Sequence, residues 1–163
     1  MKVIFLDIDG VLNPNTNIWH RKQKGEPTSS FKIKLPGDKL YRLKKIIMAT
    51  NADIIITSSW RIGFRTGTME PSPAIINLSN QLESYGLYIT GCTPLHYDRN
   101  RGEEISHYLN IFIKENKYLP QYAIIDDNIS DIVNLHKGHI IKTTTLLGIQ
   151  DEHVNIAISL LNN

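Results

Sequence analysis

Acidic or hydroxyl side chains directly follow three apolar runs of this chain, each at the point where the run ends. They are Asp7 and Asp9 after 3–6, Thr57 and Ser58 after 53–56, and Asp126 and Asp127 after 122–125. Carboxylates at the mouth of a buried strand cost free energy unless they are paired, hydrogen-bonded or bound to a metal. Gathered carboxylates are the hard oxygen ligands that Mg²⁺ prefers. The spacing therefore predicts a magnesium site built from several strand ends.

Any single one of these aspartates could instead cap the helix that follows it. Asp7 and Asp9 project to the same side, however, because side chains alternate along a strand. A second acidic pair, Asp126 and Asp127, follows a different apolar run. Two independent acidic pairs favour a shared metal site over two separate caps.

Apolar runs alternate with helix-like segments five times along the chain. The predicted strands lie at 3–6, 53–57, 87–90, 122–125 and 139–143, with helices from about 38, 74, 102 and 151 and a short one carrying Ile132 and Leu135. This alternation predicts an α/β fold, a three-layer Rossmann-like sandwich with a five-stranded, mainly parallel sheet. In such sheets the functional residues gather beyond the carboxyl ends of the strands, where the strand order reverses. The polar residues above occupy those ends.

Two polar segments interrupt this pattern without being long enough to fold a lid domain. The segment 13–36 is too long for a plain loop, and the period-two alternation of Phe31–Leu35 predicts a small hairpin within it. The segment 62–73 is rich in Gly, Thr and Pro and predicts a loop. We therefore expect one domain over 1–163 with only a small cap insert at 13–36 and an open site.

The bulk composition is that of an ordinary globular protein of 163 residues with a net charge of +2. The single cysteine, Cys92, excludes an intramolecular disulfide and a multi-cysteine zinc site. No apolar run approaches the roughly 20 residues that cross a bilayer. The N-terminal segment has no secretory pattern, so we expect a cytoplasmic (intracellular) protein without membrane contact.

The charge is unevenly distributed, because nine of the 18 Lys and Arg residues lie at 21–45. This segment could attract phosphorylated substrates or nucleic acid. It could equally be the solvated face of a helix. Two tryptophans, Trp19 and Trp60, also have two interpretations, either packing residues or platforms on which bases stack.

Three segments, in order, resemble motifs of the haloacid dehalogenase (HAD) superfamily of phosphohydrolases. FLDIDGVL at 5–12 is similar to the first motif, IIITS at 54–58 to the second, and IIDD at 124–127 with Asp131 to the acidic fourth. The third motif is usually a Lys before the acidic strand, and this chain offers only Arg99 and Arg101 there. The resemblance covers residues 3 to about 131.

The resemblance implies a role for each strand end. Asp7 would be the nucleophile that forms an aspartyl-phosphate, and Asp9 would protonate the leaving alcohol and then activate water. Mg²⁺ would be held by the Asp7 side chain, the Asp9 backbone carbonyl and Asp127, with Asp126 or Asp131 nearby. The residues that would bind the phosphate are Thr57, Ser58, Arg101 and, at the rim, Arg61, for which a surface position stacked on Trp60 is the alternative.

Shorter strings indicate a narrower group. SWR at 59–61, RGEEI at 101–105 and T..GIQ at 145–150 resemble the HAD domains of RNA-repair and polynucleotide end-processing proteins. The resemblance thus implies a phosphatase that acts on nucleotides or polynucleotide ends. A small-metabolite phosphatase and a non-catalytic binding module are the alternatives. The chain contains no P-loop motif, so no kinase activity is expected in it.

Overall fold

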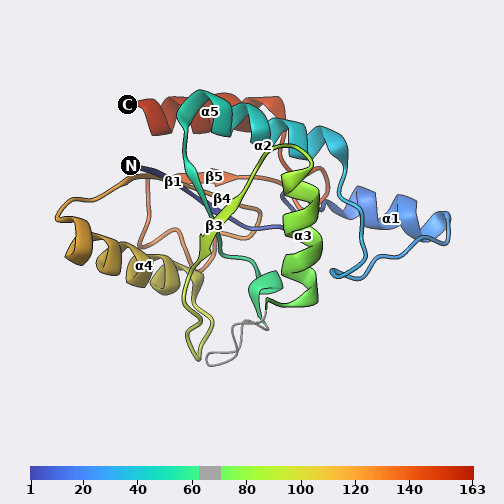
Figure 1. The fold of residues 1–163 in the computed structure, drawn as a ribbon, viewed down its shortest axis with the longest axis horizontal. Coiled ribbons are helices and arrows are strands. Elements are labelled where there is room, and N and C mark those ends of the chain that lie inside the picture. The colour runs from blue at the N-terminus through green and yellow to red at the C-terminus, as the bar shows by residue number, and fades with distance from the viewer. Residues whose placement is uncertain (63–70) are drawn as a thin grey trace.

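The computed structural model describes residues 1–62 and 71–163, which form a five-stranded parallel sheet between helices (Figure 1). The strands are β1 (Lys2–Leu6), β2 (Asp53–Ile56), β3 (Ile89–Cys92), β4 (Gln121–Asp126) and β5 (Ile140–Lys142). The helices are α1 (Asn15–Gln23), α2 (Gly37–Thr50), the 3₁₀ turn η1 (Ser59–Arg61), α3 (Pro73–Glu83), α4 (Arg101–Asn116) and α5 (Asp151–Asn162). The predicted α/β class is confirmed, and every neighbouring strand pair is parallel.

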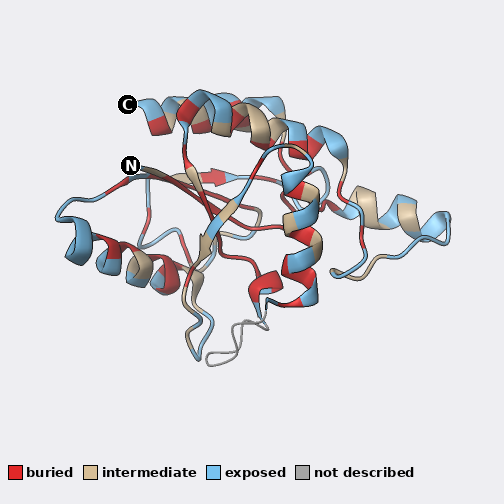
Figure 2. Ribbon diagram, in the orientation of Figure 1, coloured by how far each residue is buried: buried red, intermediate tan, exposed pale blue. Residues whose placement is uncertain are grey.

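The central strand β1 is buried on both faces, which explains why its sequence is apolar without alternation. Ile4 and Leu6 pack in the larger core with residues of α2, α3 and α5. Val3 and Phe5 pack on the other face in a smaller core with residues of α4. Figure 2 shows the buried residues on the helix sides that face the sheet. The sheet is therefore the middle of three layers.

The strand order is β3-β2-β1-β4-β5, so the side on which successive strands join the sheet changes at β1. The chain adds β2 and β3 on one side of β1 and then crosses to the other side for β4 and β5. The carboxyl ends of β1, β2 and β4 are consequently neighbours, and this is where an open parallel sheet binds its ligand. The strand order thus brings together the three sets of polar residues predicted from the sequence.

The predicted small hairpin at Phe31–Leu35 is wrong, because that segment is not a strand. Its backbone is instead bound by amide side chains of α3. Gln81 accepts a hydrogen bond from the Leu35 N–H at 2.8 Å, and Asn77 donates one to the Ile33 carbonyl at 2.9 Å. The period-two alternation still reflects burial at two positions, since Ile33 and Leu35 lie in the core, although Phe31 is exposed.

Two further local predictions need correction. The third strand runs from Ile89 to Cys92 rather than over 87–90, and Tyr88 before it is exposed. The predicted short helix at Ile132 and Leu135 is a series of turns. Only Ile132 of these two is buried, and Leu135 lies exposed, so the segment lacks a second anchor for a helix.

The insert at 13–36 holds α1, whose N-terminal end contacts the loop before α5. The Asn15 N–H donates to the Thr145 carbonyl at 2.9 Å, and the Thr16 hydroxyl donates to the Leu146 carbonyl at 3.0 Å. The predicted loop at 62–73 falls largely outside the described residues. No helix among those described is long and apolar enough to cross a membrane.

Candidate active site

Three strand ends meet around one cavity of about 430 Å³ at the carboxyl edge of the sheet. The Asp7 N–H donates to the Ile125 carbonyl of β4, and the Thr57 N–H donates to the Leu6 carbonyl of β1, both at 3.0 Å. These bonds extend the strand pairing by one residue and hold the functional side chains in register. The predicted site residues that line the cavity are Asp7, Asp9, Thr57, Arg61, Arg101 and Asp127.

Three carboxylates gather at the base of this site. Asp7, Asp126 and Asp127 each offer an oxygen within 4.8 Å of the others. Asp7 is 8% exposed and Asp126 is fully buried. Burial raises the pKa of Asp7 to about 6, and burial together with the charge of Asp7 raises the pKa of Asp126 to about 7. These carboxylates are difficult to ionise together when no cation is bound. The set therefore fits a hard divalent cation such as Mg²⁺, which would offset the mutual repulsion.

Gly10 allows Asp127 to complete this group. A Cβ at Gly10 would lie 2.2 Å from the Asp127 carboxylate carbon, and Gly10 has φ +74°. The other side of Asp127 receives a hydrogen bond from the Thr145 hydroxyl. A glycine at this position therefore serves two purposes, since it allows the backbone turn and the close approach of the Asp127 carboxylate.

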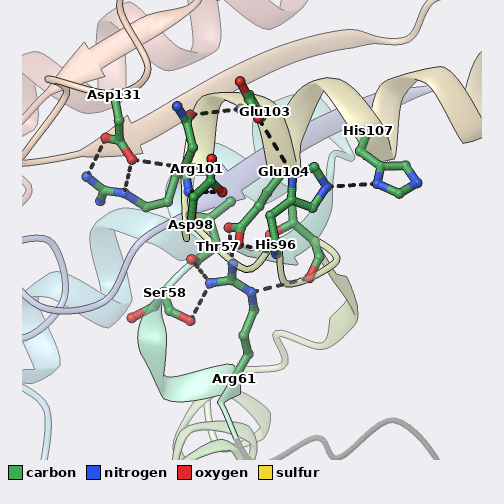
Figure 3. A network of polar contacts seen from close by, with 12 residues as sticks. Thr57, Ser58, Arg61, His96, Asp98, Arg101, Glu103, Glu104, His107 and Asp131 are labelled. Atoms are coloured by element: carbon green, nitrogen blue, oxygen red, sulfur yellow. Dashed lines mark hydrogen bonds and ion pairs between the residues drawn. The ribbon is translucent and has the colours of Figure 1, made fainter.

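Arg101 is the first residue of α4, and its side chain is held by two acidic side chains. Its guanidinium contacts Asp126 at 2.6 Å and Asp131 at 2.9 Å (Figure 3 shows the bonds to Asp131). Asp131 lies outside the carboxylate group that could hold a metal. Burial disfavours the charged form of Asp131, but the hydrogen bonds from Arg101 outweigh it and lower the pKa of Asp131. The structure thus favours Asp126 over Asp131 as the partner of Asp127 at a metal.

The second candidate for the third motif, Arg99, lies in a different environment. It also lines the cavity, and it forms no ion pair with any residue of 1–62 or 71–163. Its backbone is left-handed, with φ 55°. Arg101 therefore neutralises the acidic group, whereas Arg99 has its guanidinium available for an incoming phosphate.

Asp9 is oriented by two donors that the sequence did not identify. Its carboxylate accepts a hydrogen bond from Trp60 Nε1 at 2.8 Å and one from Asn13 Nδ2 at 2.7 Å. Trp60 is 4% exposed, so its ring is fixed by packing. Both donors engage the side chain of Asp9, and the three-carboxylate group does not include that side chain. This arrangement gives the Asp9 side chain surroundings that differ from those of the three-carboxylate group.

The residues after β2 present polar atoms to the same cavity. Thr57 is 1% exposed, and its hydroxyl has no hydrogen-bond partner among the described residues. Such an unpaired buried hydroxyl is costly unless a ligand supplies the partner. The neighbouring Ser58 hydroxyl already accepts a hydrogen bond from the Trp60 N–H at 3.4 Å. Thr57 is thus better placed than Ser58 to bind a phosphoryl oxygen.

The two interpretations of Arg61 both require correction. Arg61 is 3% exposed, so it is not a surface residue. Its guanidinium pairs with the buried Glu104 and donates to the carbonyls of Thr57, Ser58 and Thr93 (Figure 3). At most one N–H remains, which is too few for a bidentate phosphate clamp. Arg61 instead holds the backbone of the Thr57–Ser58 turn against α4.

Sequence reasoning missed several residues of the site, which are Asn13, Asn15, Glu104, Asn128 and Thr145. For Glu104, the sequence does contain one indication of its role. It occupies the inward face of α4 beside Ile105, where an acidic residue needs a partner, and Arg61 is that partner. The others are polar residues of loops or, for Asn15, of the first turn of α1. The side-chain partner of Asn13 is 4 positions away, and that of Thr145 is 18 positions away.

A second group that could hold a metal, His96, Asp98 and Glu103, lies at the start of α4. His96 also contacts the His107 ring at 2.9 Å (Figure 3). Asp98 and Glu103 are exposed, so water satisfies their charge without an ion. We therefore assign a metal site only to the buried group.

The raised pKa values give a testable dependence of stability on pH. For carboxylates whose folded pKa exceeds the unfolded value of 3.8, the stability contributed is complete below pH 3.8 and is lost as pH rises through about 6 to 7. Mg²⁺ binds the ionised forms, so it should raise the melting temperature more at pH 8 than at pH 5.5. Differential scanning fluorimetry at both pH values measures this difference.

The exposed group offers a matched control for that experiment. Asp98→Asn should leave the response to Mg²⁺ unchanged, and Asp127→Asn should remove it. An equal shift of the melting temperature at both pH values would contradict the assignment of Mg²⁺ to the buried carboxylates.

The comparisons with known proteins agree with the fold and the motif residues. The family model described as the HAD domain in Swiss Army Knife RNA repair proteins matches residues 3–154. A search of curated proteins and a search of solved structures each returned no match. The family match includes β2 to β5, all of β1 except Lys2, and every motif residue discussed above. This chain belongs to the family of HAD domains found in Swiss Army Knife RNA repair proteins.

Proposed function

We propose that this chain is a Mg²⁺-dependent phosphomonoester hydrolase that acts through an aspartyl-phosphate on phosphates at polynucleotide ends or on nucleotides. The observation that carries the proposal is that Asp7 and Asp9 have different surroundings at one cavity. Asp7 lies among three carboxylates suited to a cation, while Asp9 is held apart from them by Trp60 and Asn13. Membership of a HAD family supports the same class of chemistry.

In the first step a carboxylate oxygen of Asp7 attacks phosphorus, and the bond from phosphorus to the leaving oxygen breaks. Asp9 donates its proton to that oxygen, so the product leaves as an alcohol. In the second step Asp9 takes a proton from water, whose oxygen attacks phosphorus and breaks the bond to Asp7. Inorganic phosphate is released, and both aspartates return to their starting states.

Other residues act on the phosphoryl group. Thr57 would donate its hydroxyl to a phosphoryl oxygen, and Arg99 would pair with the phosphate charge. Asp7, Asp126 and Asp127 would hold Mg²⁺, with the Asp9 backbone carbonyl as a further ligand. The metal supplies charge neutralisation between the carboxylate nucleophile and the anionic substrate.

The proposed substrate class is supported by the family and by the positive charge of the insert that remains unpaired. The printed description of the family names RNA repair. Within the basic segment, Arg21, Arg42 and Lys45 form ion pairs with acidic neighbours and Lys39 is buried, so they are not available to a polyanion. Exposed lysines without an ion pair to a described residue remain on the insert, and they are Lys22, Lys24, Lys32 and Lys34.

A substrate panel in Mg²⁺ tests this proposal. Single-stranded oligoribonucleotides with a 3′- or 5′-phosphate, mononucleotides and sugar phosphates are compared by release of inorganic phosphate. We expect a higher kcat/KM for an oligonucleotide end or a nucleotide than for sugar phosphates. The reverse order would favour the small-metabolite alternative, and no hydrolysis of any substrate would favour the binding module.

The Trp60 contact yields a second prediction. Trp60→Phe keeps the packed ring but removes the Nε1–H that orients Asp9. We expect kcat to fall by roughly 10- to 150-fold with little change in KM, since a hydrogen bond to a charged group is worth about 1.5–3 kcal/mol. Tyr41→Phe, an exposed aromatic on α2, is the control. An unchanged kcat would show that Asn13 suffices to position Asp9.

A further inference from the structure

The helix α1 packs against the core only through Ile18, which is partly buried. None of its residues is buried, and it lies at the edge of the molecule beyond α3 (Figures 1 and 2). Trp19 on this helix is 56% exposed, with the ring of His20 edge-on at 4.8 Å. A large aromatic side chain in such a position contributes little to the core, so packing does not explain it.

The position of α1 is nevertheless well defined. Its first turn is hydrogen-bonded to the carbonyls of Thr145 and Leu146, as described above. Asn17 bridges two other segments, since its side chain donates to Asn13 Oδ1 and to the Lys34 carbonyl, both at 3.1 Å. These contacts place Trp19 in a fixed relation to the catalytic cavity.

A mainly apolar hollow lies between Trp19 and the loop before α5. It has a volume of about 440 Å³ and is lined by Asn15, Thr16, Trp19 and Leu146. Leu146 is 59% exposed, so two large apolar side chains face solvent here. The hollow can accept a flat apolar group beside the indole ring.

This hollow adjoins the catalytic cavity at Asn15. Asn15 lines both of them, and Thr145, which holds Asp127 in the catalytic cavity, precedes Leu146 of the hollow. A substrate with its phosphate at Asp7 would therefore extend its adjoining group toward Trp19. The exposed lysines of the insert add positive charge on the same segment as this ring.

We propose that Trp19 and Leu146 form a stacking subsite for a nucleobase of the substrate, next to the phosphate that is hydrolysed. This inference rests on the proposed function and specifies how the site recognises its substrate. A base has a flat apolar face that stacks on an indole ring irrespective of sequence, and its backbone phosphates pair with lysines. A terminal phosphate, a neighbouring base and the flanking phosphates together match the cavity, the hollow and the basic insert.

The test compares matched substrates in Trp19→Ala. An oligoribonucleotide with a terminal phosphate is compared with the same strand lacking the bases nearest that end, and with glycerol phosphate. We expect kcat/KM for the intact strand to fall about 10-fold, and the values for the two substrates without a base at the subsite to stay unchanged. Trp19→Phe should retain most of the activity, because a phenyl ring still stacks. Tyr41→Ala is the control for an exposed aromatic away from both cavities.

A binding measurement separates this inference from the proposed function. In Asp7→Asn, an unphosphorylated oligoribonucleotide should quench tryptophan fluorescence, and the additional change Trp19→Phe should remove that quenching. If Trp19→Ala hydrolyses the intact strand as fast as wild type and no quenching occurs, the subsite is wrong while the proposed function stands. A surface that docks a protein instead would give that same result. If wild type hydrolyses no phosphomonoester, the proposed function fails, and quenching that depends on Trp19 would still support base stacking.

Discussion

Replacing Asp7 with Asn should reduce kcat for an aryl phosphate by roughly 10³-fold or more, the scale seen when a catalytic nucleophile is removed. The amide keeps the shape of the side chain but cannot form the aspartyl-phosphate. It also removes one of the three carboxylates that gather within 4.8 Å. Initial rates with p-nitrophenyl phosphate in Mg²⁺ measure the loss.

The same substitution should not destabilise the metal-free protein at pH 8. Asp7 is buried and its pKa is raised to about 6, so its ionised form is held in the fold at a cost. A neutral amide avoids that cost, and the melting temperature without metal should equal or exceed that of wild type. The exposed Asp98→Asn serves as the control for both measurements. Activity above a tenth of the wild-type rate would exclude Asp7 as the nucleophile.

Replacing Gly10 with Ala should weaken Mg²⁺ binding by about 10- to 100-fold, the cost typical of disturbing the surroundings of a metal ligand. The new Cβ would lie 2.2 Å from the carboxylate of Asp127, so that carboxylate must move away from Asp7 and Asp126. Activity should fall at low Mg²⁺ and recover in part at high Mg²⁺. Titrating Mg²⁺ against the hydrolysis rate measures the change.

Gly86→Ala is a closely matched control for this effect. Gly86 has φ +73°, against +74° for Gly10, and a Cβ there would meet nothing within 4 Å. Both substitutions should lose a similar amount of stability, about 1 kcal/mol, through left-handed backbone strain. Only Gly10→Ala should change the Mg²⁺ requirement. Equal Mg²⁺ titrations in the two variants would show that Asp127 does not bind the metal.

Much of the fold and part of the site could be predicted because they depend on local patterns. A strand buried on both faces reads as a short apolar run, and runs that alternate with helical stripes predict a parallel sheet. Residues directly after such runs lie at one edge of the sheet whatever the loops do. For this reason the sequence predicts Asp7, Thr57 and Asp127 at one edge of the sheet, and all three line the same cavity.

Local patterns failed where a side chain from a distant segment supplied the partner. The alternation at 31–35 was real, but Asn77 and Gln81 of α3 replaced the expected second strand. Arg61 was expected to bind phosphate at the rim of the site or to lie on the surface, but it is buried in an ion pair with Glu104, which is 43 positions away. Each partner is an ordinary polar residue in its own segment, and only the chain's path brings the pair together.

The sequence by itself determined the α/β class, the parallel sheet and the strand ends that carry the acidic groups, because burial and periodicity act over a few residues. Only the tertiary structure decided which groups meet. Trp60 is paired with Asp9 across 51 positions, and Arg101 is paired with Asp126, whereas Arg99 lines the cavity without an ion pair to a described residue. Such pairings depend on the order in which strands join the sheet, and no local pattern of residues records that order.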